Sequence, residues 1–149
     1  MSGAVAATVR VFLFVAFTLP LMPLQLLFLL VWPTLAKRFP HFYHRTLCHI
    51  LGFEVVVHGQ APRRGPCLLV SNHVSWIDIV VLSAVTPLSF VAQQEVAAWP
   101  FFGWLAKLQR TVFVDRGRRH TTKRKNDELQ ERLAAGDCLV LFPEGTSHD

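Results

Sequence analysis

The chain has 149 residues, of which 52% are hydrophobic and only 17% are charged, and its formal net charge is +5. This length suits a single domain with a modest core, and the composition is more apolar than that of an ordinary soluble domain. The basic balance favours an anionic partner. A nucleic-acid-binding protein would more often carry a basic helix face or aromatic residues among its lysines and arginines, so we expect lipid instead.

The N-terminus is dominated by an apolar stretch. No charged residue occurs between positions 11 and 36, and residues 11–32 are long enough to cross a bilayer. Because Pro20 and Pro23 interrupt this stretch, it fits either a kinked spanning helix or two shorter helices lying in one leaflet. Lys37 and Arg38 follow it, and this positive charge predicts an inner (cytoplasmic) membrane protein whose remaining residues lie on the cytoplasmic side.

Residues 40–51 resemble a short amphipathic helix with His44 and Cys48 on one face. A metal site is conceivable there, but no second pair of ligands stands at a recognisable spacing, so we favour an interfacial helix at the headgroup level. The three cysteines include no CxxC pair, which argues against a disulfide framework. We expect Cys67 and Cys138, which each open an apolar run, to be small buried residues in a reducing compartment.

From residue 53 onward, short apolar segments alternate with helical ones. The predicted strands are residues 53–57, 67–70, 89–92, 111–114 and 138–142, and the predicted helices are residues 76–85, 94–108 and 122–135, the last capped by Gly136. This alternation predicts an α/β fold with a mostly parallel sheet and flanking helices, preceded by an N-terminal hydrophobic membrane helix or helical hairpin. We assign residues 1–50 to the membrane-associated segment and residues 51–149 to the α/β domain.

A histidine and an aspartate follow the second predicted strand, in the segment SNHVSWID. On one continuous helix His73 and Asp78 would not face each other, so we place His73 before the helix and Asp78 in its first turn. The imidazole can then fold back onto the carboxylate, which would fix its tautomer and stabilise the imidazolium. Alternatively, Ser75 and Asp78 form a capping box, and this segment alone does not decide between the two readings.

Two further motifs follow later strands. The segment TVFVDR ends in Arg116, whose guanidinium can bind a phosphate through paired N–H donors; the alternative is a solvated basic loop. The segment FPEGT offers the carboxylate of Glu144, close backbone approach at Gly145 and the hydroxyl of Thr146; the alternative is an ordinary turn.

In this order, NHxSWxD, FVDR and FPEGT resemble the motifs of the glycerolipid acyltransferase family, and most closely those of bacterial 1-acyl-sn-glycerol-3-phosphate acyltransferases. The resemblance runs from about Pro62 to Thr146. It implies that His73 is the general base and that Asp78 orients it. The residues that it implies for substrate binding are Asn72, Arg116, Glu144, Gly145 and Thr146.

The resemblance further implies transfer of a fatty acyl group from acyl-CoA or acyl-carrier protein to the sn-2 hydroxyl of lysophosphatidate, giving phosphatidate, without a metal or other cofactor. We expect the oxyanion donors among backbone N–H groups at the start of the helix after Ser75. The family often has Gly in place of Arg110 and Arg in place of Ser147, so another lysolipid, such as an amino-acid-containing one, is an alternative acceptor. A non-catalytic membrane protein that binds anionic lipid is the alternative class. Because family members usually continue beyond FPEGT, we expect an N-terminal portion of a longer protein.

Overall fold

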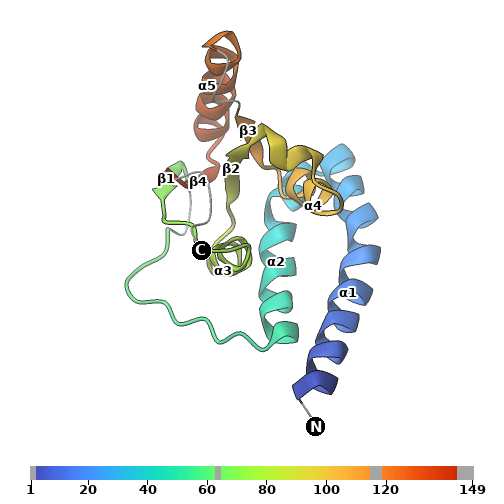
Figure 1. Cartoon of the computed structure of the whole chain (residues 1–149). Helices are drawn as coiled ribbons and strands as arrows, with labels where there is room; N and C mark the ends of the chain where they lie inside the picture. The colour runs from blue at the N-terminus through green and yellow to red at the C-terminus, as the bar shows by residue number, and fades with distance from the viewer. Residues whose placement is uncertain (1–2, 63–64, 115–118, 144–149) are drawn as a thin grey trace.

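The computed structural model describes residues 3–62, 65–114 and 119–143, without the side chains of residues 119–125. Two long helices precede an alternation of strands and helices (Figure 1). The elements are α1 (Gly3–Val31), α2 (Pro33–Leu51), β1 (Cys67–Val70), α3 (Ile77–Val85), β2 (Ser89–Gln93), the 3-10 helix η1 (Gln94–Ala98), α4 (Phe102–Leu108), β3 (Val112–Val114), α5 (Arg119–Ala134) and β4 (Cys138–Leu141). The predicted α/β class is confirmed.

The four strands form one parallel sheet in the order β1-β4-β2-β3. β4, the last strand among the described residues, therefore lies inside the sheet, with Cys138 opposite Cys67 and Leu141 opposite Val70. The predicted strand at residues 53–57 is wrong, because this segment is extended but outside the sheet. Its alternating apolar side chains have a different partner: Phe53 and Val55 pack against a helical cluster centred on Leu47.

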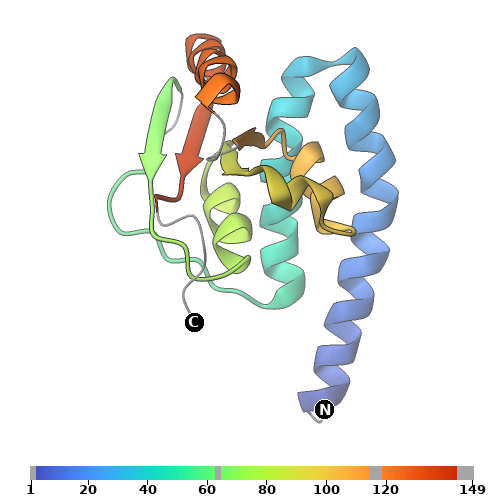
Figure 2. The same ribbon diagram turned by 45° about the horizontal axis from the view of Figure 1, so that its top comes forward.

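Three helices, α3, α2 and α1, are stacked beside the sheet (Figures 1 and 2). α3 lies between the sheet and α2, and α1 is outermost (Figure 2). Ile79 and Leu82 of α3 face the sheet, where they pack against a cluster that includes Phe90 and Val140. Val80, on the other side of α3, is buried against Leu47 of α2. Because α3 is apolar on both sides, it fixes the position of its own first turn, which carries Asp78.

α1 is one continuous helix that passes through Pro20 and Pro23, so the reading of two shorter helices within this stretch is wrong. Only a narrow stripe of it is buried. Thr18 and Tyr43 share a hydrogen bond of 2.8 Å between their hydroxyls, and the Gln25 side chain donates to the Ala36 carbonyl at 3.0 Å. By length and composition, α1 as a whole is long and apolar enough to cross a membrane, and 11% of its apolar 18-residue window is buried.

The predicted helix at residues 94–108 is divided into η1 and α4. Two residues between them cause the break: Pro100 cannot donate a helical hydrogen bond, and Phe101 has a positive φ of 60°. The resulting sharp turn brings α4 directly against η1. A Cβ atom added at Gly103 would lie 2.6 Å from the carbonyl oxygen of Ala97, so the two helices meet at a position where only glycine fits.

We expect Gly103→Ala to lower the free energy of unfolding by about 1–3 kcal/mol, the usual cost of overpacking a tight contact. The atom in the way is a backbone oxygen, which cannot rotate aside. Thermal unfolding in detergent, followed by circular dichroism, would measure the change. Gly3→Ala in α1 is the matched control, because nothing lies within 4 Å of its added Cβ atom. Equal melting temperatures for the two variants would contradict the tight contact.

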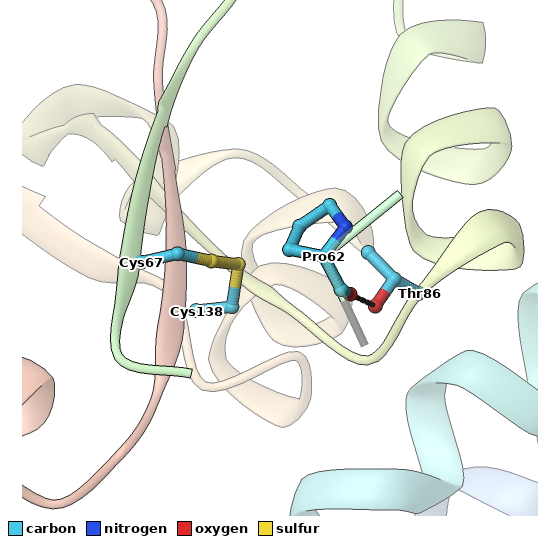
Figure 3. The surroundings of a disulfide bond; sticks show 4 residues. All are labelled: Pro62, Cys67, Thr86 and Cys138. Carbon is cyan, nitrogen blue, oxygen red and sulfur yellow. Dashed lines mark hydrogen bonds between the residues drawn. A yellow bond between two sulfur atoms is a disulfide. The ribbon is translucent and has the colours of Figure 1, made fainter. Parts of the chain in front are cut away.

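The expectation that Cys67 and Cys138 are reduced is wrong in this structure, where a disulfide joins them (Figure 3). They stand directly opposite each other on β1 and β4, with Cα atoms 4.6 Å apart. Their separation of 71 residues conceals this proximity in the sequence, and only the strand register shows it. Figure 3 also shows the Thr86 hydroxyl donating to the Pro62 carbonyl at 2.7 Å, which ties the extended segment to the end of α3. The third cysteine, Cys48, is buried and free.

Candidate active site

His73 and Asp78 face each other at the carboxyl edge of the sheet. His73 lies in the loop after β1, and Asp78 lies in the first turn of α3. The Nδ1 atom of His73 is 3.0 Å from Oδ2 of Asp78. Both side chains are partly open to solvent, with 22% of His73 and 28% of Asp78 exposed. With Nδ1–H donated to the carboxylate, Nε2 is the ring nitrogen that can accept a proton from a bound molecule.

Asp78 also holds the loop that carries His73. Its Oδ2 atom accepts hydrogen bonds from the backbone N–H groups of Val74 at 2.7 Å and Ser75 at 3.0 Å. The Ser75 hydroxyl in turn accepts from the Ile77 N–H at 3.2 Å. One carboxylate oxygen of Asp78 thus binds both His73 and the Ser75 N–H, as half of a capping box would, but the N-cap of α3 is Trp76 and the predicted full box with Ser75 as N-cap is not formed.

Asp78 remains ionised under ordinary conditions. Burial by itself raises the pKa of its carboxyl. The hydrogen bonds from the Ser75 and Val74 N–H groups and from His73 together lower the pKa by a larger amount, so the net pKa is below its usual value. A fixed negative charge beside Nδ1 stabilises the imidazolium that forms when Nε2 takes a proton.

The expected oxyanion donors at the start of α3 are largely occupied. The N–H groups of Val74 and Ser75 point to Asp78, and that of Ile77 points to the Ser75 hydroxyl. The Asp78 N–H is bonded to the Ser75 carbonyl. The prediction that this turn supplies the donors is therefore wrong for these four groups, because the same turn uses them to hold its own shape.

Phe142 is a site residue that the sequence reasoning missed. Its ring stacks on the His73 imidazole, with centroids 4.3 Å apart and an interplanar angle of 24°. The contact arises because β1 and β4 are parallel neighbours, and it is reinforced where the Ser71 N–H donates to the Leu141 carbonyl at 3.1 Å. The available signal was its position: Phe142 opens the FPEGT motif at the end of an apolar strand. The first and third motifs thus meet at His73.

Four of the predicted substrate-binding residues lie outside the described residues: Arg116, Glu144, Gly145 and Thr146. The strands that lead to them, β3 and β4, run parallel to β1, so their carboxyl ends share the edge that carries His73. Asn72 is exposed in the loop immediately before His73. The binding roles of these five residues stay predictions.

His44 is buried inside the protein. The prediction that its imidazole lies at the membrane headgroup level is therefore wrong. Its Nδ1 atom lies 2.9 Å from the Pro40 carbonyl and 3.0 Å from the Ser83 hydroxyl, which also accepts a hydrogen bond from the Gln109 amide at 3.1 Å. Burial lowers the pKa of His44 to about 4, so the ring is neutral. This network fastens α3 to α2 and to the end of α4.

Arg110 belongs to a charged cluster at the opposite edge of the sheet from His73. Its guanidinium donates to Asp137 at 2.9 Å, and Lys37 and Arg132 bind the same carboxylate. The backbone of Arg110 has a positive φ of 62°, a conformation that glycine adopts without strain. The proposed influence of Arg110 on acceptor choice finds no support here, because its side chain is engaged away from the candidate site.

Comparison with known proteins agrees with the motifs. Residues 54–149 match the Acyltransferase family over most of the α/β domain. The chain belongs to this family.

Two of the similar curated proteins are named as lyso-ornithine lipid acyltransferases, and a third as an acyltransferase of 1-acyl-sn-glycerol-3-phosphate. The chain is 49% identical over 146 residues to a lyso-ornithine lipid O-acyltransferase of Brucella abortus, covering 95% of this chain and 55% of that protein. It is 49% identical over 139 residues to the enzyme of the same name from Rhizobium meliloti, covering 92% of this chain and 47% of that one. A 1-acyl-sn-glycerol-3-phosphate acyltransferase of Neisseria gonorrhoeae is 42% identical over 77 residues, covering 52% of this chain and 30% of that protein.

The chain thus spans about half the length of the two lyso-ornithine lipid enzymes. No solved structure matches it.

Proposed function

We propose that this chain carries the acyl-transfer site of a membrane-bound enzyme that esterifies the free hydroxyl of a lyso-ornithine lipid with a fatty acyl group. The observation that carries the proposal is the His73 imidazole, held by the ionised Asp78 at the carboxyl edge of a parallel sheet. A protein that only binds anionic lipid needs a basic surface but has no use for a positioned proton acceptor.

In the proposed reaction, Nε2 of His73 takes the proton from the acceptor hydroxyl as its oxygen attacks the thioester carbonyl of acyl-CoA or acyl-carrier protein. A new carbon–oxygen bond forms, the tetrahedral intermediate collapses, and the carbon–sulfur bond breaks. The imidazolium returns its proton to the departing thiolate, so His73 ends the cycle neutral. Asp78 stabilises the imidazolium throughout. No covalent acyl-enzyme is required.

The proposed acceptor follows from the extent of the likeness to the relatives. The alignment with the lyso-ornithine lipid enzyme of Brucella abortus includes nearly the whole chain, from the α1–α2 pair onward, whereas that with the Neisseria gonorrhoeae enzyme includes about half. Lysophosphatidate is the second candidate, because the motifs of the α/β domain resemble those of enzymes that use it. The two acceptors differ in their polar groups: lysophosphatidate has a phosphate, and a lyso-ornithine lipid has an amino-acid headgroup.

We further propose that α1 anchors the enzyme to the inner membrane with the site on the cytoplasmic side, a placement that the charge pattern favours and that the Cys67–Cys138 disulfide, a bond uncommon in the cytoplasm, opposes. Lys37, Arg38 and Arg45 follow the apolar helix, against Arg10 within it, and such an asymmetry favours a cytoplasmic location for the following domain.

The two acceptors can be compared in one assay. Membranes carrying the protein as encoded, from Met1 to the end of its reading frame, would receive labelled acyl-carrier protein or acyl-CoA together with a lyso-ornithine lipid, lysophosphatidate, or both. We expect label in the diacylated ornithine lipid, and an excess of unlabelled lysophosphatidate should not suppress it. Preferential formation of phosphatidate would favour the second candidate. If membranes that contain the folded protein transfer label to neither acceptor, the result would favour the alternative of a non-catalytic protein that binds anionic lipid.

A further inference from the structure

A cluster of exposed aromatic side chains lies on the η1–α4 segment. Trp99, Phe102 and Trp104 fall within six consecutive positions and are 56%, 51% and 61% exposed. Large aromatic side chains normally bury most of their surface, and several exposed together mark an interaction site. We call Trp99, Phe102 and Trp104 the aromatic patch.

The aromatic patch is continuous with α1. The ring of Phe102 lies edge-on to that of Phe101, with centroids 5.7 Å apart, and Phe101 in turn lies edge-on to Phe14 of α1 at 6.4 Å. The Gln25 side chain of α1 also donates to the Leu108 carbonyl at the end of α4, at 2.9 Å. These contacts hold α4 beside the apolar helix, as Figures 1 and 2 both show.

The neighbouring surface of α1 is itself apolar and exposed. Val11, one helical turn before Phe14, is 60% exposed, and Phe12, on another side of the same turn, is 69% exposed. A bilayer that receives α1 would therefore reach α4 as well, because the two helices are in contact through Phe14 and Gln25.

The chemistry of the aromatic patch fits the boundary between acyl chains and headgroups. Tryptophan combines an apolar ring with an N–H donor, and it is enriched where a protein crosses that boundary. The Nζ atom of Lys107 lies 5.4 Å from the centroid of the Trp104 ring, which puts a cation at the rim of the patch, within reach of anionic headgroups.

We propose that the aromatic patch inserts into the headgroup–acyl boundary of an anionic bilayer, so that η1 and α4 form a second membrane contact beside α1. The sheet would then be held at a fixed height above the lipid by two elements instead of one. This contact is separate from acyl transfer and does not depend on which acceptor is used.

Tryptophan fluorescence tests the proposal, because the chain has only four tryptophans, at positions 32, 76, 99 and 104. The probe chain carries Trp32→Phe, Trp76→Phe and Trp99→Phe and so retains Trp104 alone. It would be reconstituted into vesicles of phosphatidylcholine and phosphatidylglycerol, with and without acyl-brominated lipid. We expect the emission of Trp104 to shift to shorter wavelength, to be quenched by the brominated lipid and to lose its accessibility to aqueous acrylamide.

The matched control places the only tryptophan on the other side of the molecule. Val56 is 66% exposed in the extended segment, which both views show away from α1 and α4. A chain with all four tryptophans changed to Phe and with Val56→Trp should keep its acrylamide quenching and resist the brominated lipid. The proposal would be overturned if Trp104 in vesicle-bound protein is quenched by acrylamide and not by the brominated lipid, as in this control. Shielding from acrylamide without bromine quenching would also overturn it, since a protein partner would then cover the patch.

Discussion

His73→Ala is expected to reduce the rate of acyl transfer by about 10²- to 10⁴-fold, the range that a positioned general base contributes. Without the imidazole, the acceptor hydroxyl must attack the thioester while it still carries its proton. The Asp78 carboxylate remains, but it is bonded to the backbone of its own turn and faces the position of Nδ1, not that of Nε2. Initial rates with saturating acyl donor would measure the loss.

His58→Ala is a suitable control, because His58 is an exposed histidine in the extended segment. It should transfer acyl groups at the wild-type rate. The fold of the His73→Ala protein should be preserved, since the Val74 and Ser75 N–H groups keep their hydrogen bonds to Asp78. A His73→Ala protein with near-normal activity would remove His73 from the mechanism and leave the site without an assigned base.

Asp137→Asn is expected to lower the free energy of unfolding by about 3 kcal/mol, at the lower end of the cost of removing one partner from a buried ion pair. The carboxylate is only 7% exposed and binds three cations: Lys37 at 2.8 Å, Arg110 at 2.9 Å and Arg132. These cations come from α2, from the start of β3 and from α5. A neutral amide would leave them close together without a counter-charge.

The dependence on pH separates this electrostatic effect from a simple packing defect. Burial by itself raises the pKa of Asp137. Its bonds to Lys37 and Arg132 and the nearby charge of Arg110 together lower the pKa by a larger amount, so the net pKa in the folded protein is below its usual value. A carboxyl with a lowered folded-state pKa stabilises the protein fully above its unfolded-state pKa of about 3.9 and loses that contribution as the pH falls through the folded-state pKa.

The melting temperatures of wild type and Asp137→Asn should therefore differ most near neutral pH and converge below about pH 4. Asp127→Asn, at an exposed position of α5, should melt like the wild type at every pH. A difference for Asp137→Asn that stays constant down to low pH would mean that the amide is destabilising through its shape and not through the lost charge. Because the cluster lies at the edge opposite His73, folded Asp137→Asn should retain its transfer activity.

The parts of the fold that depend on local pattern could be predicted from the sequence. Strands β1 and β4 are short apolar runs bounded by turn residues, and the predicted bounds agree with the structure to within one residue. The His73–Asp78 contact could also be predicted, because it depends on five consecutive peptide units and on one helix start. Local geometry alone sufficed in these cases.

Most of the failures depend on long-range placement. Residues 53–57 alternate as a strand does, but Phe53 and Val55 found their apolar partners on helices. The Cys67–Cys138 bond and the Phe142–His73 stack both require that β4 lie next to β1, which no local pattern reveals. Pro100 was a local signal for the break in residues 94–108, but the helical pattern on both sides of it led to the prediction of one continuous helix.

The interior position of β4 has a consequence for protein synthesis. On the ribosome, β1, β2 and β3 emerge first, but β1 cannot join β2 because the strand that separates them has not yet been translated. Until residue 141 has left the exit tunnel, the nascent chain presents unpaired strand edges on both sides of the gap, and such edges readily pair with other chains. Insertion of β4 closes the gap and delivers Phe142 to His73 in the same event. The joining of β1 to β2 and the placement of Phe142 against His73 therefore depend on the same strand, β4.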